Sequence, residues 1–106
     1  MKAINRIKKS EDFALTINKG HFNRLPSFKV FINKTDRNYT RVGLSVSSKL
    51  GCAVVRNRVK RQVRAMCDSL IDYQAKSQDI VIIVKSHFLE MTFNDNKSQL
   101  SDLFKN

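Results

Sequence analysis

The chain has 106 residues, with 20 Lys and Arg against nine Asp and Glu and a formal net charge of +11. A chain of this length can bury a modest core without disulfides or a structural metal. No apolar run reaches the roughly 18 residues of a membrane span, and the N-terminus lacks the apolar stretch of a signal peptide. We therefore expect a single cytoplasmic domain over residues 1–106, with no membrane partner.

The positive charge is concentrated in the first two thirds of the sequence. Residues 1–67 hold 16 Lys and Arg against three acids, whereas residues 68–106 hold four against six. From Arg37 to Cys67 there is no acid at all. Cations without acidic neighbours in the sequence should have few partners inside the molecule, so we expect them to face an external anion.

The first predicted element is a helix over about residues 10–19. Ser10, followed by two acids, has the side chain of a helix N-cap, and Gly20 is a typical helix end. Phe13 and Ile17 are four residues apart and should share one face of this helix.

Three strands should follow, at 21–24, 28–33 and 39–47. Residues 35–38 have turn chemistry, so the second and third strands are expected to pair as a hairpin. One face of that hairpin is uniformly apolar. The other face mixes aromatic and basic side chains, namely Phe31, Tyr39, Lys29 and Arg41. Such a face can stack unpaired bases, although the same pattern also fits an ordinary solvated surface.

A second helix is predicted over about residues 53–70. The spacing of its apolar residues is that of a buried stripe: Val59, Val63, Met66 and Leu70. The face turned away from this stripe carries a polar ridge about 12 Å long, with Arg58 alone on the other flank. We call the following set the basic ridge: Arg56, Asn57, Lys60, Arg61 and Arg64.

RNA binding explains the basic ridge better than the alternatives do. Like charges at i, i+4 destabilise an isolated helix by roughly 0.2 to 0.5 kcal/mol per pair, and a polyanion reverses that sign. Arg offers forked donors to phosphate oxygens, and Asn57 can also accept from a 2′-hydroxyl or a base edge. A merely solvated face would usually mix both signs of charge. A helix that lies on an anionic membrane or binds calmodulin usually carries bulkier anchors than Val.

Residues 79–85 contain five consecutive apolar residues, Ile80 to Val84, and should form a strand buried on both faces. With the preceding strand and the second helix it makes a strand–helix–strand crossover. A terminal helix is predicted over about residues 94–105, with an apolar stripe at Leu100, Leu103 and Phe104. The fold class is therefore α/β (α+β), a four-stranded mixed sheet with about three helices in the order α-β-β-β-α-β-α.

Little in the sequence points to catalysis by the protein alone. There is no GxSxG or P-loop motif, His21 and His87 lack a visible partner, and the acids are too scattered for a two-metal nuclease. Cys52 and Cys67 lie too far apart on one helix for a disulfide, and we expect both to be small packing residues. We expect no catalytic or metal-binding residue in the protein and no small-molecule substrate.

Three motifs, in sequence order, resemble the protein component of bacterial ribonuclease P. NRIKKSEDF at 5–13 is similar to the family's N-terminal helix start, and RVGLSVSSKLGCAV at 41–54 to its strand and glycine turn. ArgAsnArg at 56–58, with the cations that follow it, matches the family's RNR signature helix. The resemblance covers almost the whole chain.

The resemblance implies a two-layer α/β sandwich whose crossover through the RNR helix is left-handed, against the usual rule. It also implies a ribonucleoprotein in which a catalytic RNA removes the 5′ leader from precursor tRNA. The protein would be a subunit of this endoribonuclease, binding the catalytic RNA and the single-stranded leader without supplying a catalytic group. The implied cofactor is Mg²⁺, bound mainly by the RNA.

The site residues implied by the resemblance fall into two groups. Contacts to RNA are expected from Arg56, Asn57, Arg58, Lys60, Arg61, Arg64, Lys49 and Arg41. A leader-binding cleft is expected from Phe13, Ile17, Phe31 and Lys29. Three positions depart from the family pattern: Ile17 replaces a common aromatic, Ser48 a frequent Lys and Cys52 a frequent Asn. Leader affinity is therefore expected to be weaker than is typical. The alternative is a non-enzymatic RNA-binding protein such as a ribosomal component.

Overall fold

The computed structural model describes residues 1–105. In chain order the helices and strands are α1 (Ser10–Lys19), β1 (His21–Arg24), β2 (Phe28–Lys34), β3 (Arg41–Val46), α2 (Ala53–Leu70), β4 (Gln78–Val84) and α3 (Phe93–Phe104). Short 3-10 helices precede α1, α2 and α3, namely η1 (Ala3–Asn5), η2 (Ser48–Leu50) and η3 (Ser86–Glu90). The predicted element order and the mixed sheet are confirmed. Within the described residues, no helix combines the length and the hydropathy needed to cross a membrane.

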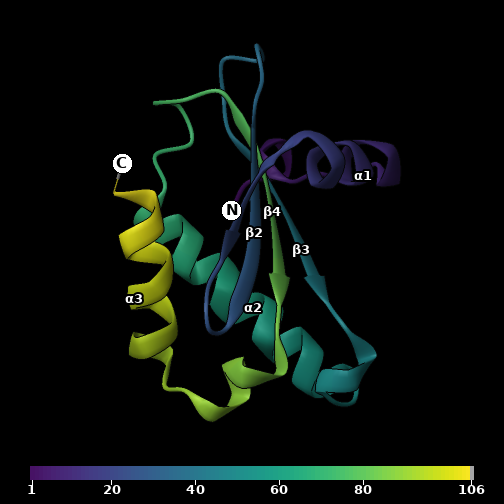
Figure 1. Cartoon of the computed structure of the whole chain (residues 1–106), viewed down its shortest axis with the longest axis vertical. Helices are drawn as coiled ribbons and strands as arrows, with labels where there is room; N and C mark the ends of the chain where they lie inside the picture. Colours follow the sequence, from purple (N-terminus) through teal and green to yellow (C-terminus); the bar gives the residue numbers. More distant parts are fainter. Residues whose placement is uncertain (106) are drawn as a thin grey trace.

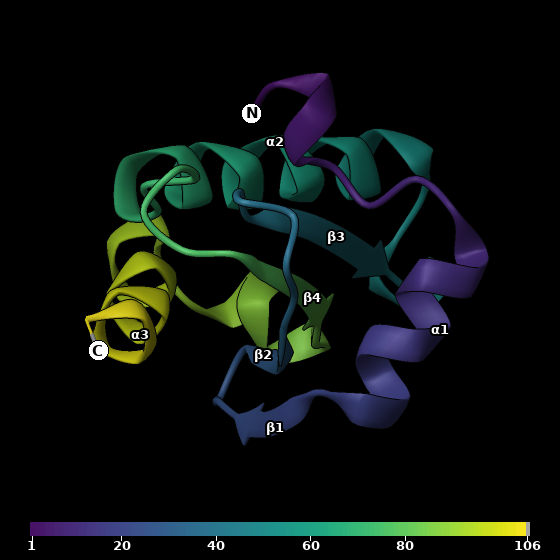
Figure 2. The ribbon, with the colours of Figure 1, turned by 90° about the horizontal axis from the view of Figure 1, so that it is seen from above.

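The helices cover the two faces of the sheet unequally (Figures 1 and 2). α2 and α3 pack on one face and enclose the hydrophobic core with it. Phe28 and Val30 of β2, Ile82 of β4 and Leu100 of α3 are among the fully buried members of this core. α1 crosses the opposite face, where it packs against β2 and β4. One face of the sheet is thus sealed by helices, while the other is only partly covered.

The predicted hairpin between the second and third strands is wrong. The strand order is β1-β2-β4-β3, so β4 lies between β2 and β3. β2 pairs antiparallel with β1 and β4, and β3 pairs parallel with β4. The apolar β4 takes this central place because it is largely buried on both faces. The polar segment after β2 hydrogen-bonds instead to the segment before β4, with Thr40 N–H donating to Tyr73 O at 2.8 Å.

The connection from β3 through α2 to β4 is left-handed, as the resemblance implied. β3 and β4 run parallel as neighbours, and in Figure 1 both point downward with β3 on the right and α2 behind them. Gly51 makes the turn between η2 and α2 with a φ of 148°, which disfavours any residue that has a Cβ. A Cβ there would also lie 3.1 Å from Cβ of Val55. The entry into α2 therefore depends on glycine at this position.

The start of α1 differs from the prediction. Lys9 is the N-cap residue and Ser10 is the first residue of the helix, so the hydroxyl of Ser10 does not cap it. The predicted end at Gly20 is confirmed, and the Gly20 N–H donates to Thr16 O at 2.8 Å. A Cβ at Gly20 would lie only 2.4 Å from Thr16 O, so the close approach of the backbone requires glycine here.

The two cysteines have opposite environments. Cys67 is buried beside the apolar stripe of α2, and this burial raises the pKa of its thiol to about 12. The expectation that Cys52 also packs in the core is wrong, because Cys52 is exposed at the N-cap of α2. The nearby backbone N–H groups of Val55 and Val54 at the helix start lower the pKa of the Cys52 thiol. The helix start thus favours the thiolate at Cys52, while the core disfavours it at Cys67.

We predict that alkylation distinguishes these thiols. Iodoacetamide near neutral pH should label Cys52 rapidly in the folded protein and Cys67 only after unfolding in urea, because the thiolate is the reactive species. Mass spectrometry of the labelled peptides measures both rates. A Cys52→Ser variant serves as the control and should stay unlabelled while folded. Equal labelling of both thiols in the folded protein would contradict the buried position of Cys67.

Candidate nucleic-acid interface

The packing of α2 determines the direction of the basic ridge. Val59, Val63 and Met66 are almost fully buried against the sheet and α3. The ridge lies on the opposite side of the helix, where Asn57 and Arg61 are exposed. Arg56, Lys60 and Arg64 are half-buried.

The positive charge of the basic ridge is not neutralised within the described part of the chain. Across residues 1–105, none of its cations forms an ion pair with a carboxylate. The same holds in that range for Arg58, which is exposed on the flank. Nε of Arg56 is buried and has no hydrogen-bond partner among the described residues. Cations that bind an external polyanion are expected to lack carboxylate partners within the protein, as these do.

The N-terminal segment adds a cation that sequence reasoning missed. Arg6 lines one groove with Asn57, Lys60, Arg61 and Arg64 of the ridge. The segment is held there because Asn5 Nδ2 donates to Thr40 O at 2.9 Å and Ile7 N–H donates to Val42 O at 3.1 Å. Figure 2 shows the N-terminal turn lying over α2. Only the packing of distant segments brings Arg6 to the ridge, so no local pattern could have found it.

Asp68 is the acid that lies at the end of the same groove. Its carboxylate is already engaged by the N-terminal amine of Met1 and by the Tyr73 hydroxyl, which donates at 2.8 Å. Burial acts to raise the pKa of Asp68, but these hydrogen bonds outweigh it and the net shift is downward. Asp68 therefore anchors the N-terminal segment to α2 instead of neutralising the ridge.

A second surface lies on the other side of the sheet, where α1 crosses it. Phe13 and Ile17 line one hollow along α1, as their spacing predicted. The ring of Phe13 rests on β3 at Gly43, where a Cβ would lie 2.8 Å from the ring. Glycine at position 43 thus allows α1 to pack close to the sheet.

Phe31 and Lys29 of β2 belong to this second surface because they point away from the core. Their neighbours along β2, Phe28 and Val30, are fully buried in the core, whereas Phe31 and Lys29 are half-buried. In the ladder Phe31 is opposite Val81 of β4, which in turn is opposite Gly43 of β3, where Phe13 rests. The structure therefore places the four predicted cleft residues on one face. We call Phe13, Ile17, Lys29 and Phe31 the cleft residues.

Phe22 of β1 is an aromatic on the same face that sequence reasoning also missed. It is opposite Phe31 in the ladder, with the ring centroids 5.0 Å apart and the ring planes inclined by 32°. Its strand was predicted, but the pairing of β1 with β2 was not. Phe22 could not be found from the sequence, because the pairing and register of β1 with β2 bring it beside Phe31.

Arg41 does not have the environment expected of a phosphate contact. It donates to Asp79 through Nε at 3.0 Å and Nη2 at 2.7 Å, and Nη1 donates to Asp12 at 3.3 Å. The hydrogen bond with Asp79 is the largest cause that raises the pKa of Arg41. Arg37 also donates to Asp79, at 3.0 Å. The expectation of few internal partners is thus wrong for Arg41 and Arg37, because β4 and α1 bring acids from distant parts of the sequence.

Lys49 and the departures from the family pattern lie near the start of α2. Lys49 and Ser48 are exposed on η2, and Cys52 is exposed one turn further along the chain. Ser47 Oγ accepts a hydrogen bond from Lys49 N–H at 3.1 Å and thereby caps η2. These exposed positions are accessible to RNA, but contact with it stays a prediction.

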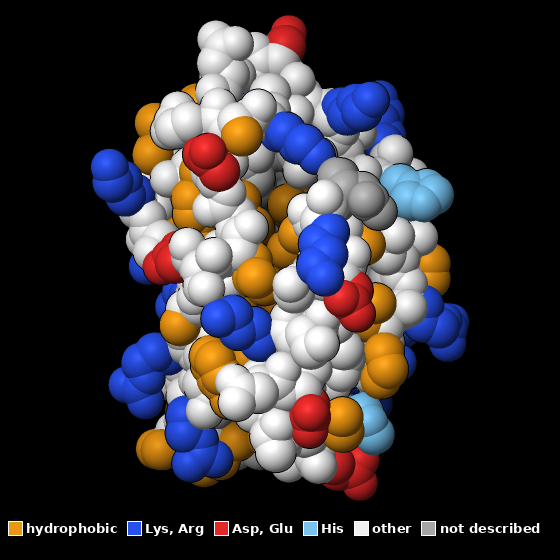
Figure 3. Space-filling view, turned by 90° about the vertical axis from the view of Figure 1, so that its left-hand side faces the viewer, with side chains coloured by type: hydrophobic (Ala, Val, Ile, Leu, Met, Phe, Trp, Pro, Cys, Tyr) orange, Lys and Arg blue, Asp and Glu red, His pale blue; other side chains and the backbone are white. Residues whose placement is uncertain are grey.

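The side of the molecule that carries α3 lacks the uniformly positive charge of the basic ridge. The side that carries α3 mixes acidic and basic side chains around a hollow where hydrophobic side chains are visible (Figure 3). Among the described residues, no group of three or more His, Cys, Asp or Glu is arranged to hold a metal ion.

Together, the mixed sheet, the left-handed crossover and the cationic helix define a small basic α/β protein built to bind a polyanion. The family model described as Ribonuclease P matches residues 1–106. The ribonuclease P protein component of Bacillus cereus strain 03BB102 is 42% identical over 106 residues, covering 99% of this chain and 92% of its own length. The chain belongs to the ribonuclease P protein family.

Two solved structures of the family share the fold. The Staphylococcus aureus RNase P protein has 34% identity and a TM-score of 0.83, covering 98% of this chain and 94% of its own. The Thermotoga maritima RNase P protein has 30% identity and a TM-score of 0.80, covering 94% of each chain. Membership makes this chain a component of an endoribonuclease complex whose partner is RNA. The alternative of a ribosomal component is not supported.

We predict that Asp79 is essential for stability. Asp79→Asn leaves Arg41 and Arg37 without their carboxylate, and breaking such a buried pair should lower the free energy of unfolding by about 3 kcal/mol. Urea unfolding followed by circular dichroism measures the change. Glu90→Gln removes an acid from an exposed pair with His87 and should change stability by less than about 0.5 kcal/mol. Equal effects of the two substitutions would contradict a structural role for Asp79.

Proposed function

We propose that this protein binds the catalytic RNA of ribonuclease P through the basic ridge and holds the 5′ leader of precursor tRNA in the cleft. Removal of the leader by phosphodiester hydrolysis is then carried out by groups of the RNA. The observation that carries the proposal is a cationic helix face with no carboxylate partner among the described residues. The hollow along α1 and the half-buried Phe31 and Lys29 on the same face of the sheet support the binding of a leader there.

The ridge suits the backbone of a folded RNA. Mutual repulsion of its cations destabilises α2, and phosphates placed between them convert this repulsion into attraction. Arg guanidinium groups donate in pairs to phosphate oxygens, and Asn57 can both donate and accept at a ribose 2′-hydroxyl. Arg6 lies in the same groove and adds a further donor beyond those of α2.

The cleft suits a single strand. Phe31 is half-buried, so its ring is supported by the sheet while part of it can stack on an unpaired base. Lys29 lies on the same face and can contact a phosphate of that strand. Phe13 and the aliphatic Ile17 form the wall that α1 provides. Because Ile17 offers no aromatic face, we propose that leader affinity is lower than an aromatic would give.

The proposal assigns Mg²⁺ to the RNA and not to a site of the protein. The described residues offer no carboxylate cluster that fits the ion. Their contribution is electrostatic, because cations on α2 reduce the repulsion between the catalytic RNA and its substrate. We also propose the cytoplasm as the compartment, since both cysteines are free and one is exposed.

A reconstitution tests the proposed function. The protein is added to the catalytic RNA at low Mg²⁺, and removal of the precursor-tRNA leader is measured. The wild-type protein should stimulate cleavage, while a variant with Arg56, Lys60 and Arg64 changed to Gln should need more Mg²⁺ and more protein. In binding assays this variant should flatten the slope of log K against log salt by about 2 to 3, at roughly 0.7 to 0.9 per phosphate contact.

A charge-matched variant is the control for this experiment. Changing Lys34 of β2, Lys97 of α3 and Lys105 at the C-cap of α3 to Gln removes as much charge and should leave the slope nearly unchanged. Equal slopes for the ridge variant and the wild type would place the catalytic RNA elsewhere on the protein. Cleavage by the protein without RNA would overturn the assignment of catalysis to the RNA.

Phe31→Ala tests the cleft. It should weaken binding of leader-bearing precursor tRNA to the holoenzyme by about 1 to 3 kcal/mol, the value of one lost stack. Binding of mature tRNA, which has no leader, should not change. Equilibrium binding of both RNAs to the same preparation measures the difference. Equal losses for the two RNAs would remove Phe31 from the leader path.

A further inference from the structure

We propose that Phe22 and Arg24 of β1 form a further binding position for single-stranded RNA, beyond Phe31 and toward the edge of the sheet. Phe22 would stack on an unpaired base of the leader, and Arg24 would bind a phosphate next to it. This inference rests on the proposed binding of the leader in the cleft. It adds a second aromatic platform that neither the sequence motifs nor the comparisons assign.

The first support is the geometry of the aromatic pair. The rings of Phe22 and Phe31 have centroids 5.0 Å apart with planes inclined by 32°, which is a tilted arrangement. Phe22 remains 41% exposed although it makes this contact. A base that stacks on Phe31 therefore finds a second ring beside the first. Two neighbouring rings can accept successive bases, as stacking platforms for single strands do.

The second support is the charge around these rings. Arg24 lies two positions after Phe22, so both side chains are on the same face of β1, and its Cζ is 5.9 Å from the Phe22 centroid. Arg24 is opposite Lys29 in the ladder. Across residues 1–105, neither Arg24 nor Lys29 forms an ion pair with a carboxylate. Two like charges directly opposite each other destabilise a strand pair, and a phosphate between them would remove that cost.

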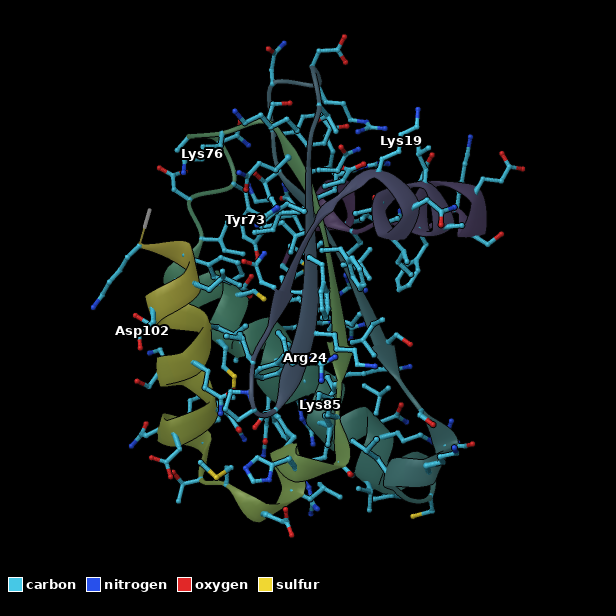
Figure 4. All side chains as sticks on the ribbon, viewed as in Figure 1. Lys19, Arg24, Tyr73, Lys76, Lys85 and Asp102 are labelled. Atoms are coloured by element: carbon cyan, nitrogen blue, oxygen red, sulfur yellow. The ribbon has the colours of Figure 1, made fainter. Side chains whose placement is uncertain are left out.

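The third support is the openness of this end of the sheet. Next to Lys29 in the same cross-strand row are Ile83 of β4 and Ser45 of β3, and both are half-buried. Figure 4 places Arg24 at the same end of the sheet as Lys85, away from Lys19 at the end of α1. Lys85 Nζ donates to Leu25 O at 3.1 Å and so fixes the end of β1 to β4. The end of β1 is therefore held to the end of β4, while the side chains around Lys29 remain partly exposed.

The charge of this surface favours RNA over a protein strand as the occupant. β1 is an edge strand of only four residues, which offers few backbone groups for strand addition. The side chains on the exposed face of β1 and β2 are aromatic, basic or amide, with Asn33 completing the row. An apolar or acidic peptide would gain little from such a surface, whereas stacking bases and phosphates match both of its components.

The test must separate stacking on RNA from simple packing against Phe31. Phe22→Ala removes both, whereas Phe22→Leu keeps an apolar contact with Phe31 and removes the aromatic face. Phe93→Ala is the matched control, because Phe93 has the same exposed fraction of 41% but lies on α3, across the sheet. Circular dichroism and thermal melts of each variant report on folding.

The holoenzyme is reconstituted with each variant, and its affinity is measured for precursor tRNAs whose leaders are shortened one nucleotide at a time. Phe22→Ala and Phe22→Leu should each weaken binding of long leaders about tenfold and leave the shortest leaders unaffected. Leaders that carry one abasic nucleotide then locate the contact. The abasic position that weakens binding to the wild type, but not to Phe22→Ala, is the base that stacks on Phe22.

The outcomes separate this inference from the proposed function. If Phe31→Ala weakens binding of leaders and the Phe22 variants do not, Phe22 is outside the RNA path and only the present inference fails. If Phe22→Leu binds like the wild type while Phe22→Ala does not, the role of Phe22 is packing, and the inference again fails. If leader length has no effect on affinity in any variant, the proposal of leader binding fails as well.

Discussion

The burial of one apolar stripe on α2 is the constraint on which the arrangement of this protein depends. Val59, Val63 and Met66 have no stable place except between the sheet and α3, and their burial determines the rotation of α2 about its axis. The basic ridge must then project outward, although its cations repel one another. Hydrophobic packing thus stabilises a distribution of charge that the helix alone would disfavour, and that charge becomes available to an RNA.

A second set of interactions builds the opposite surface. The ion pairs of Arg41 with Asp79 and Asp12 join β3, β4 and α1, and Asp12 immediately precedes Phe13. Together with the close approach of the Phe13 ring to Gly43, they hold α1 across the sheet. The ridge and the cleft therefore lie on different sides of one sheet. Under the proposed function, α2 would contact the RNA subunit while a separate strand occupied the cleft.

The structure divides the cations of the chain by role. The high net charge of the first two thirds suggested cations that face an external anion, yet Arg37 and Arg41 are bound to Asp79 within the molecule. Arg6, which lies far from α2 in the sequence, is instead placed beside the ridge, and Arg24 is placed beside an aromatic ring. Charge in the sequence therefore indicated the class of partner, whereas folding decided which charges can meet it.

The sequence by itself determined the features that depend on neighbours along the chain. Periods of 3.6 and 2 residues indicated the helices and strands, the buried stripe, the direction of the ridge and the shared face of Phe13 and Ile17. The RNR motif with its flanking segments indicated the family. The tertiary structure alone decided the strand order, with β4 inserted between β2 and β3. It also decided the partners of Arg41, the position of Arg6 and the pairing of Phe22 with Phe31. These features join residues far apart in sequence, and which segments pair depends on how the whole chain buries its most apolar strand, a global balance that no local pattern encodes.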